Sequence, residues 1–359
     1  MLQTELTNRL GITYPIVQAP MAGGITTTEL VEAVYNSGGL GSIGAGYMLP
    51  DLLQKQISEL KEKRVKTFNV NLFVPERVQA TEDEVNRAKK ALTPFYESLN
   101  IKLKDISVPS YSDLNQTYQD QIDVVIKERV SVVSFTFGLP QKEIVQILQD
   151  AGSIVMGTAT TTKEAKAIEQ LGMDFVIVQG SEAGGHRGNF LQEVEESQLG
   201  LIALIPQVVD AVSIPVIAAG GIMDGRTLVA ALALGAEGVQ MGTAFLTTTE
   251  SGAHPLHKKS IVNAKGHDTV LTTTFSGKHA RGIKNDFIEK IVEANGQILP
   301  YPLQNTLTQP LRAEAQKNNR SEYMSLWSGQ ATQLAKEQSV EELIHSVTEE
   351  AKERLEKLE

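Results

Sequence analysis

The chain has 359 residues, of which 41% are hydrophobic and 21% are charged, and this composition excludes a disordered or low-complexity protein. It contains 33 basic and 43 acidic residues, and the resulting formal net charge of -10 argues against nucleic acid as a partner. Because it contains no cysteine, disulfides, cysteine nucleophiles, zinc–cysteine sites and iron–sulfur clusters are all excluded.

Short apolar runs rich in β-branched residues, each bounded by glycine or proline, predict eight strands. Several runs are apolar almost without interruption, which is typical of strands buried on both faces of a parallel sheet. The runs lie at residues 15–19, 39–43, 67–74, 130–137, 154–157, 175–179, 215–219 and 238–241.

Stretches with helical periodicity separate most of these runs, at residues 28–37, 49–63, 141–151, 162–171 and 224–234. Successive strands start about 20 to 30 residues apart, the spacing of a βα unit, and eight such units close into a barrel. The sequence therefore predicts an α/β fold, a (βα)8 TIM barrel with an additional, mostly helical lobe over its C-terminal face. The competing fold, an open doubly wound sheet, requires a Gly-x-Gly-x-x-Gly motif after the first strand. Instead Gly41, Gly44 and Gly46 follow the second run, with a different spacing.

The domain boundaries follow from two long gaps between the predicted strands. We expect the barrel to comprise residues 1–74 and 128–248, because the polar composition of the segment between these ranges predicts that it leaves the barrel. Residues 75–127 and 249–330 would form the lobe. Residues 331–359 would add a helix packed on the barrel, opened by a capping box at residues 339–342.

Three amides stand where apolar strands end, at Asn71, Gln179 and Gln240. In a TIM barrel the C-terminal ends of the strands carry the active site. A buried amide needs hydrogen-bond partners, and either a flat polar cofactor or the backbone of neighbouring loops would supply them.

Glycines and one threonine end the last two strands, at Gly221, Gly242 and Thr243. Backbone N–H groups at this position of the fold commonly bind phosphate. The alternative is that the glycines serve only tight turns.

His186 follows the flexible pair Gly184-Gly185 at the predicted mouth of the barrel. An imidazole there is a candidate general base, although many loop histidines are plain surface residues. His254 and His257 are three residues apart, but Pro255 lies between them and no third ligand is evident. We therefore expect no metal site.

These motifs resemble those of the FMN-dependent nitronate monooxygenases, formerly called 2-nitropropane dioxygenases. The resemblance covers the whole predicted barrel and continues into the lobe. The motifs that carry it are residues 18–24, 69–75, 180–188, 218–222, 240–243, 275–285, 301–305 and 327–330.

The resemblance implies an oxidoreductase that detoxifies alkyl nitronates such as propionate 3-nitronate. Members oxidise them with O2 to a carbonyl compound plus nitrite, through one-electron transfer from the nitronate to FMN. It also implies that residues 21–23 line the flavin, and that His186 acts as base when a neutral nitroalkane is offered. The residues implied to hold FMN are Asn71, Gln179, Gly184, Gly221, Gln240, Met241, Gly242 and Thr243.

Two other interpretations share this barrel. Flavin-dependent enoyl-acyl carrier protein reductases and NADH:quinone reductases of the same superfamily have many of the motifs, although the strand at 69–75 and the Gly-His-Arg-Gly segment resemble the monooxygenases more. A barrel that only binds a phosphorylated ligand, without catalysis, is the third possibility.

The remaining expectations concern partners and location. An anionic nitronate needs a locally positive site, for which Arg187, Lys278 and Arg281 are candidates unless they are ordinary ion-paired surface residues. The N-terminus has no secretory pattern and no segment reaches the ~20 apolar residues of a membrane span. We expect a cytoplasmic monomer or homodimer without a membrane partner.

Overall fold

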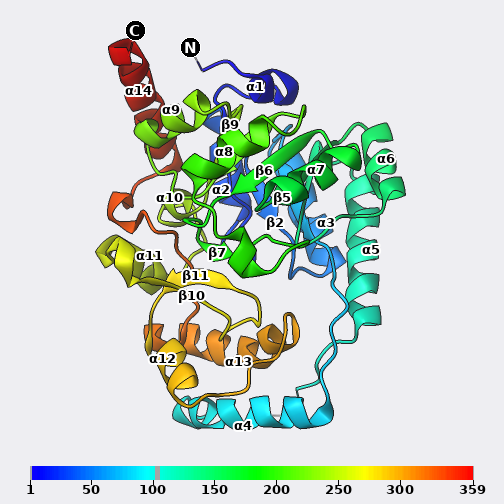
Figure 1. Cartoon of the computed structure of the whole chain (residues 1–359), viewed down its shortest axis with the longest axis vertical. Helices are drawn as coiled ribbons and strands as arrows, with labels where there is room; N and C mark the ends of the chain where they lie inside the picture. Colours follow the sequence, from blue (N-terminus) through cyan, green and yellow to red (C-terminus); the bar gives the residue numbers. More distant parts are fainter. Residues whose placement is uncertain (1, 102–105, 359) are drawn as a thin grey trace.

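A barrel of parallel strands forms the centre of the computed structural model, which describes residues 2–101 and 106–358 (Figure 1). Eight strands pair in the order β1-β9-β8-β6-β5-β4-β3-β2. A parallel bridge between Val17 and Leu40 connects the two ends of this order, so the barrel closes. The predicted TIM barrel is confirmed. Its strands are β1 (Ile16–Gln18), β2 (Ser42–Gly44), β3 (Asn69–Phe73), β4 (Val132–Thr136), β5 (Ile154–Ala159), β6 (Phe175–Gln179), β8 (Val216–Ala219) and β9 (Gly238–Met241).

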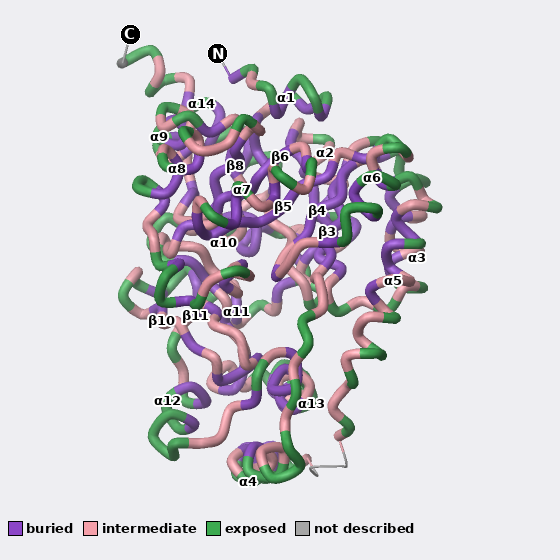
Figure 2. Tube along the Cα trace, turned by 45° about the vertical axis from the view of Figure 1, so that its right-hand side comes forward, coloured by how far each residue is buried: buried purple, intermediate pink, exposed green. Residues whose placement is uncertain are grey.

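Amphipathic helices cover the outside of the barrel. Figure 2 shows the strands buried and the outward faces of the helices exposed. Most of these helices bury an apolar stripe against the strands or against a neighbouring helix and leave a polar face in water. The helices around the barrel are α1 (Glu5–Leu10), α2 (Thr28–Asn36), α3 (Pro50–Glu62), α5 (Tyr111–Lys127), α6 (Lys142–Asp150), α7 (Thr162–Gln170), α8 (Leu201–Val209), α9 (Gly225–Ala233), α10 (Thr243–Leu246) and α14 (Val340–Leu358).

Helix α5 differs from the sequence-based expectation that all of residues 75–127 belong to the lobe. It packs against α3 and β3, and Tyr118, Ile122 and Val125 are buried in the barrel's own core. Its polar composition concealed this buried stripe. The excursion into the lobe therefore consists of α4 (Glu82–Ser98) and its flanking segments.

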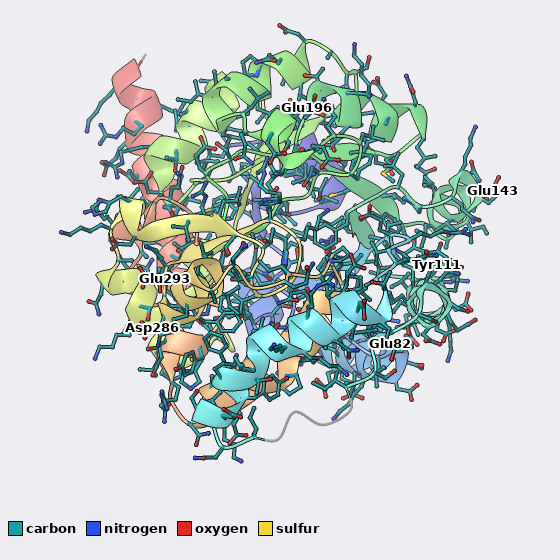
Figure 3. The ribbon with its side chains drawn as sticks, turned by 60° about the horizontal axis from the view of Figure 1, so that its bottom comes forward. Glu82, Tyr111, Glu143, Glu196, Asp286 and Glu293 are labelled. Carbon is teal, nitrogen blue, oxygen red and sulfur yellow. The ribbon has the colours of Figure 1, made fainter. Side chains whose placement is uncertain are left out.

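The lobe lies beyond the C-terminal ends of the strands and has a hydrophobic core of its own. Phe287 is at its centre, with ring centroids 4.8 Å from Phe95 and 4.6 Å from Phe275. Figure 3 shows α4 crossing α13 at the far end, where the Tyr96 hydroxyl donates to the Leu307 carbonyl at 2.7 Å. The other lobe elements are α11 (Pro255–Asn263), β10 (Thr269–Thr272), β11 (Ala280–Ile283), α12 (Asp286–Glu293) and α13 (Leu303–Lys317).

A short strand joins the barrel to the lobe. This strand, β7 (Gly185–His186), follows β6 but pairs antiparallel with β11, opposite Ala280 and Arg281. The Arg187 N–H extends the pairing by donating to the His279 carbonyl at 2.8 Å. The loop after β6 is therefore fixed by the lobe.

Helix α14 packs against α9 and α2 on the outside of the barrel. The approach to α9 is close, because a Cβ at Gly225 would lie 2.4 Å from the Ala351 nitrogen. Among the helices of the described residues, none combines the length and the apolar character that crossing a membrane requires.

Candidate active site

A cavity of about 190 Å³ lies between the C-terminal ends of the barrel strands and the lobe. Among the described residues that line it, none is an aspartate or a glutamate. The lining is mostly backbone, amide and aromatic, and comprises Ala19–Ala22, Ile25, Tyr47, Asn71, Phe73, Thr136, Phe137, Thr158, Ile177, Gln179, Ala183–His186, Ala219–Met223, Gln240, Gly242, Thr243, Leu246, Trp327–Gly329 and Ala331.

The three predicted amides line this cavity and differ in the hydrogen bonds that their side chains make. Asn71 Nδ2 donates to the Ser134 hydroxyl at 2.9 Å and to the Thr136 hydroxyl at 3.0 Å. Gln179 Nε2 donates to the His186 carbonyl at 2.9 Å, and its Oε1 accepts from the Gly188 N–H at 2.8 Å. Gln179 thus bonds the neighbouring loop backbone.

Gln240 differs from the other two amides. Its Oε1 is buried, and no donor within residues 2–101 and 106–358 reaches it. A buried acceptor without a donor costs about 1 to 3 kcal/mol. Gln240 therefore lines the cavity and has an acceptor that no described donor uses.

The predicted glycines and threonine also line the cavity. Gly221 has φ +67°, a left-handed conformation that favours glycine. A Cβ at Gly184 would lie 2.5 Å from the Gly329 nitrogen, so this position requires glycine for a close approach of the lobe. Thr243 Oγ1 accepts from the Gly329 N–H at 3.0 Å.

One predicted cofactor contact, Met241, lies elsewhere. Its side chain is 1% exposed and belongs to the barrel core, and it is absent from the described cavity lining. It ends β9, where alternate side chains face opposite sides of the strand. Its neighbour Gly242 lines the cavity.

His186 stands on β7 in an aromatic cage. Its ring centroid lies 5.5 Å from Trp327, 5.8 Å from Phe137 and 5.9 Å from Tyr301. Burial, assisted by the positive charge of Lys278, lowers the pKa of His186 to about 3. The imidazole is therefore neutral at physiological pH.

The three predicted cations are not among the described residues that line the cavity. In the described part of the chain, no carboxylate oxygen lies within 4.0 Å of Arg187, Lys278 or Arg281. Arg187 is 1% exposed and donates to the Gly180 and Ser197 carbonyls, each at 2.7 Å. Lys278 Nζ lies 5.0 Å above the Phe137 ring. Arg187 is thus structural, whereas Lys278 is close to His186.

The three aromatic residues of the cage, and Phe73 beside Phe137, were not among the predicted site residues. Phe73 and Phe137 stand at or just after the ends of β3 and β4, so the strand-end rule could have found them. Tyr301 and Trp327 come from the lobe, and their positions relative to the barrel carry no local signal.

His254 and His257 have structural roles. His257 Nε2 lies 2.9 Å from the Trp327 carbonyl, and His254 Nδ1 accepts from the Leu256 N–H at 3.2 Å. The described residues include no group of three or more His, Asp or Glu arranged to hold a metal.

Comparison with known proteins matches this architecture to one family. The model of that family, described as "Nitronate monooxygenase", matches residues 3–350. The chain belongs to the nitronate monooxygenase family. A probable nitronate monooxygenase of Staphylococcus haemolyticus is 47% identical, with 97% of each chain covered. That of Bacillus subtilis is 46% identical, with 96% of this chain and 98% of the relative covered.

Two solved structures resemble this family member over its full length. Nitroalkane oxidase from Streptomyces ansochromogenes has a TM-score of 0.90 at 38% identity, with 99% of each chain covered. FabK from Thermotoga maritima has a TM-score of 0.78 at 34% identity, covering 100% of this chain and 99% of its own. As a nitronate monooxygenase family member, the chain is an enzyme, an oxidoreductase.

The family is flavin-dependent in general, and the cavity of this member fits a flavin. The unused Gln240 acceptor suits an N–H group of a ligand, because an amide oxygen accepts hydrogen bonds. Gly185 and Gly242 leave space at the wall, since a Cβ added at Gly185 would meet nothing within 4 Å. The absence of carboxylates from the described lining suits an anionic cofactor.

Proposed function

We propose that this enzyme is an FMN-dependent nitronate monooxygenase. It would oxidise alkyl nitronates such as propionate 3-nitronate with O2, giving a carbonyl compound and nitrite. The observation that carries the proposal is electrostatic: a neutral, buried His186 lines a cavity that has no carboxylate among its described lining residues, and Lys278 Nζ lies 5.0 Å above the ring of Phe137, which also lines the cavity. Positive charge in a poorly solvated site favours an anionic substrate.

FMN would be held between the barrel and the lobe. When bound, it supplies the chemistry of accepting an electron from the nitronate. We propose that Gln240 accepts a hydrogen bond from it, and that Gly221, Gly242 and Thr243 lie at its phosphate. Asn71, Gln179 and Gly184 would shape the wall, and Met241 would support it from the core.

His186 would act only when the substrate arrives as a neutral nitroalkane. A neutral imidazole has a lone pair that can accept a proton from the carbon next to the nitro group. The Lys278 ammonium would stabilise the anion that this step produces. A nitronate is already deprotonated, so for that substrate His186 would only contact the anion.

The test is anaerobic mixing of the purified protein with propionate 3-nitronate and, separately, with NADH, while the flavin absorbance is recorded. We expect the nitronate to change the absorbance of the oxidised flavin, and O2 to restore it with release of nitrite. A response to NADH without one to the nitronate would favour a flavin-dependent NAD(P)H reductase. A colourless protein would contradict both functions and favour a barrel that only binds a phosphorylated ligand.

A further inference from the structure

The hydroxyl group of Ser276 contacts the imidazole of His186 from the lobe. Ser276 is 1% exposed, and its Oγ lies 2.8 Å from His186 Nε2. The same Oγ lies 3.0 Å from the Lys278 carbonyl oxygen and 3.3 Å from the Lys278 nitrogen. Three groups therefore compete for one hydroxyl.

A serine hydroxyl has one proton to donate and two lone pairs that accept. The Lys278 carbonyl can only accept, and within the described chain Ser276 is its sole donor. The hydroxyl proton therefore goes to this carbonyl. The lone pairs then accept from the Lys278 N–H and from Nε2, which must carry the proton of the neutral imidazole.

The opposite tautomer leaves the Lys278 carbonyl without its hydrogen-bond donor. If Nε2 were the acceptor, the hydroxyl would turn away from the Lys278 carbonyl, and Nδ1 would carry a proton. No described group hydrogen-bonds Nδ1, because the rings of Phe137, Tyr301 and Trp327 form the surroundings of the imidazole. The hydrogen bond that the Lys278 carbonyl would lose costs free energy, so the Nε2–H tautomer is favoured.

Hydrogen bonds to the backbone of His186 keep its imidazole beside Ser276. The His186 carbonyl accepts from Gln179 Nε2 at 2.9 Å, and the residue pairs with Ala280 in β11. Nδ1 is not among the buried atoms that lack a partner, so it is open to the cavity that His186 lines. The free lone pair of the neutral ring thus faces the cavity.

We propose that Ser276 is a positioning residue that fixes His186 in the Nε2–H tautomer and leaves Nδ1 as the proton-accepting atom. In the reaction with a neutral nitroalkane, the C–H bond next to the nitro group breaks, its proton moves to Nδ1 and its electron pair remains on the nitronate. This second part rests on the proposed function, whereas the tautomer itself does not.

The decisive measurement is the ¹⁵N NMR spectrum of the flavin-loaded protein labelled at histidine, recorded near neutral pH. His186 signals are assigned by their loss in His186→Asn. We expect a protonated signal for Nε2, coupled to both ring protons, and an unprotonated signal for Nδ1. A protonated Nδ1 in the wild-type protein would overturn the proposal.

Two variants test the part that Ser276 plays. Ser276→Ala should shift both nitrogen signals toward an average of the two tautomers, and Ser276→Thr, which keeps the hydroxyl, should restore the wild-type pattern. Thr274→Val is the matched control, because Thr274 is equally buried in the same segment and its hydroxyl bonds Thr272 instead. An unchanged spectrum in Ser276→Ala would refute the positioning role.

Kinetics separate this inference from the proposed function. In Ser276→Ala, we expect kcat with a neutral nitroalkane to fall roughly tenfold, the value of one hydrogen bond, while nitronate turnover stays within about twofold. Equal losses on both substrates would contradict the assignment of Nδ1. If the wild-type protein turned over neither substrate, the proposed function would fail, and the NMR spectrum would still decide the tautomer.

Discussion

The two walls of the cavity have different chemical characters. On the barrel wall, the side-chain amides of Asn71 and Gln179 are hydrogen-bonded to neighbouring protein atoms. Glycine at position 184 allows the lobe backbone to approach this wall closely. On the lobe wall, Trp327 and Lys278 surround a histidine that is hydrogen-bonded to lobe strand β11. The barrel therefore supplies shape and the loop that carries His186, and the lobe supplies charge and fixes the position of this histidine.

The largest expected effect comes from forcing the two walls apart. In Gly184→Val the new side chain would collide with the backbone at Gly329, since a Cβ already lies 2.5 Å from its nitrogen. We expect the free energy of unfolding to fall by about 3 kcal/mol and bound flavin to be lost. Urea unfolding and flavin absorbance measure both effects. The control Gly152→Ala, at a left-handed glycine with nothing within 4 Å, should retain flavin.

Removing the histidine tests whether His186, which the lobe holds in place, is the base. We expect His186→Asn to lower nitroalkane turnover by roughly 100-fold, the lower end for a general base, and nitronate turnover by less than about fivefold. Steady-state assays with a nitroalkane and its preformed nitronate provide the comparison. Similar losses on the two substrates would remove the base role from His186.

The two glutamines of the barrel wall should respond in opposite ways. Gln179→Leu removes the acceptor of the Gly188 N–H, so the free energy of unfolding should fall by about 2 kcal/mol. Gln240→Leu removes an acceptor that has no donor in the described chain, so stability should hold while the dissociation constant of FMN rises about tenfold. Urea unfolding and flavin titration of the apoprotein separate the two results. Loss of stability in Gln240→Leu would show that its amide is structural.

Acid should weaken the fold through histidines buried at the lobe wall. Burial lowers the pKa of His186 to about 3 and that of His257 to about 4, both below the ordinary value of 6.5. At pH values between the folded-state pKa of each histidine and 6.5, the histidine is protonated in the unfolded chain and neutral in the folded chain. Stability is therefore greatest above 6.5 and falls with decreasing pH, by up to about 1.4 kcal/mol per pH unit for each histidine.

Urea unfolding of the wild-type protein at a series of pH values below neutrality measures this slope. In His186→Asn the free energy of unfolding should fall less steeply with decreasing pH, by the contribution of one histidine, up to about 1.4 kcal/mol per pH unit. If the free energy of unfolding of the variant depended on pH as steeply as that of the wild-type protein, the pKa of His186 in the folded state would be close to its ordinary value.

The barrel was predictable because its strands are buried on both faces and several of them are apolar almost without interruption, so they leave a local pattern. Strands β7, β10 and β11 were not predicted, since β7 is only Gly185–His186 and forms through pairing with residues distant in sequence. Helix α5 was misassigned because its buried stripe lies within a polar segment.

The candidate site was predictable to the extent that strand ends determine it. His186, Gln240 and Gly221 were singled out for their position after buried strands, and the structure brings them to one cavity. The bonding state of each amide depends on loops that approach from elsewhere, so the sequence could not separate Gln240 from Gln179. The contact between His186 and Ser276 depends on the lobe fold in the same way.

The pairing of β7 with β11 also bears on biosynthesis. The loop that carries His186 leaves the ribosome long before Ala280 and Trp327, the residues that hold and enclose it. Barrel strands β2 to β6 pair with their neighbours in sequence and can associate while synthesis continues. An incomplete chain would therefore have much of the scaffold without an ordered proton acceptor, and the enzyme would become competent only when its C-terminal part has been made.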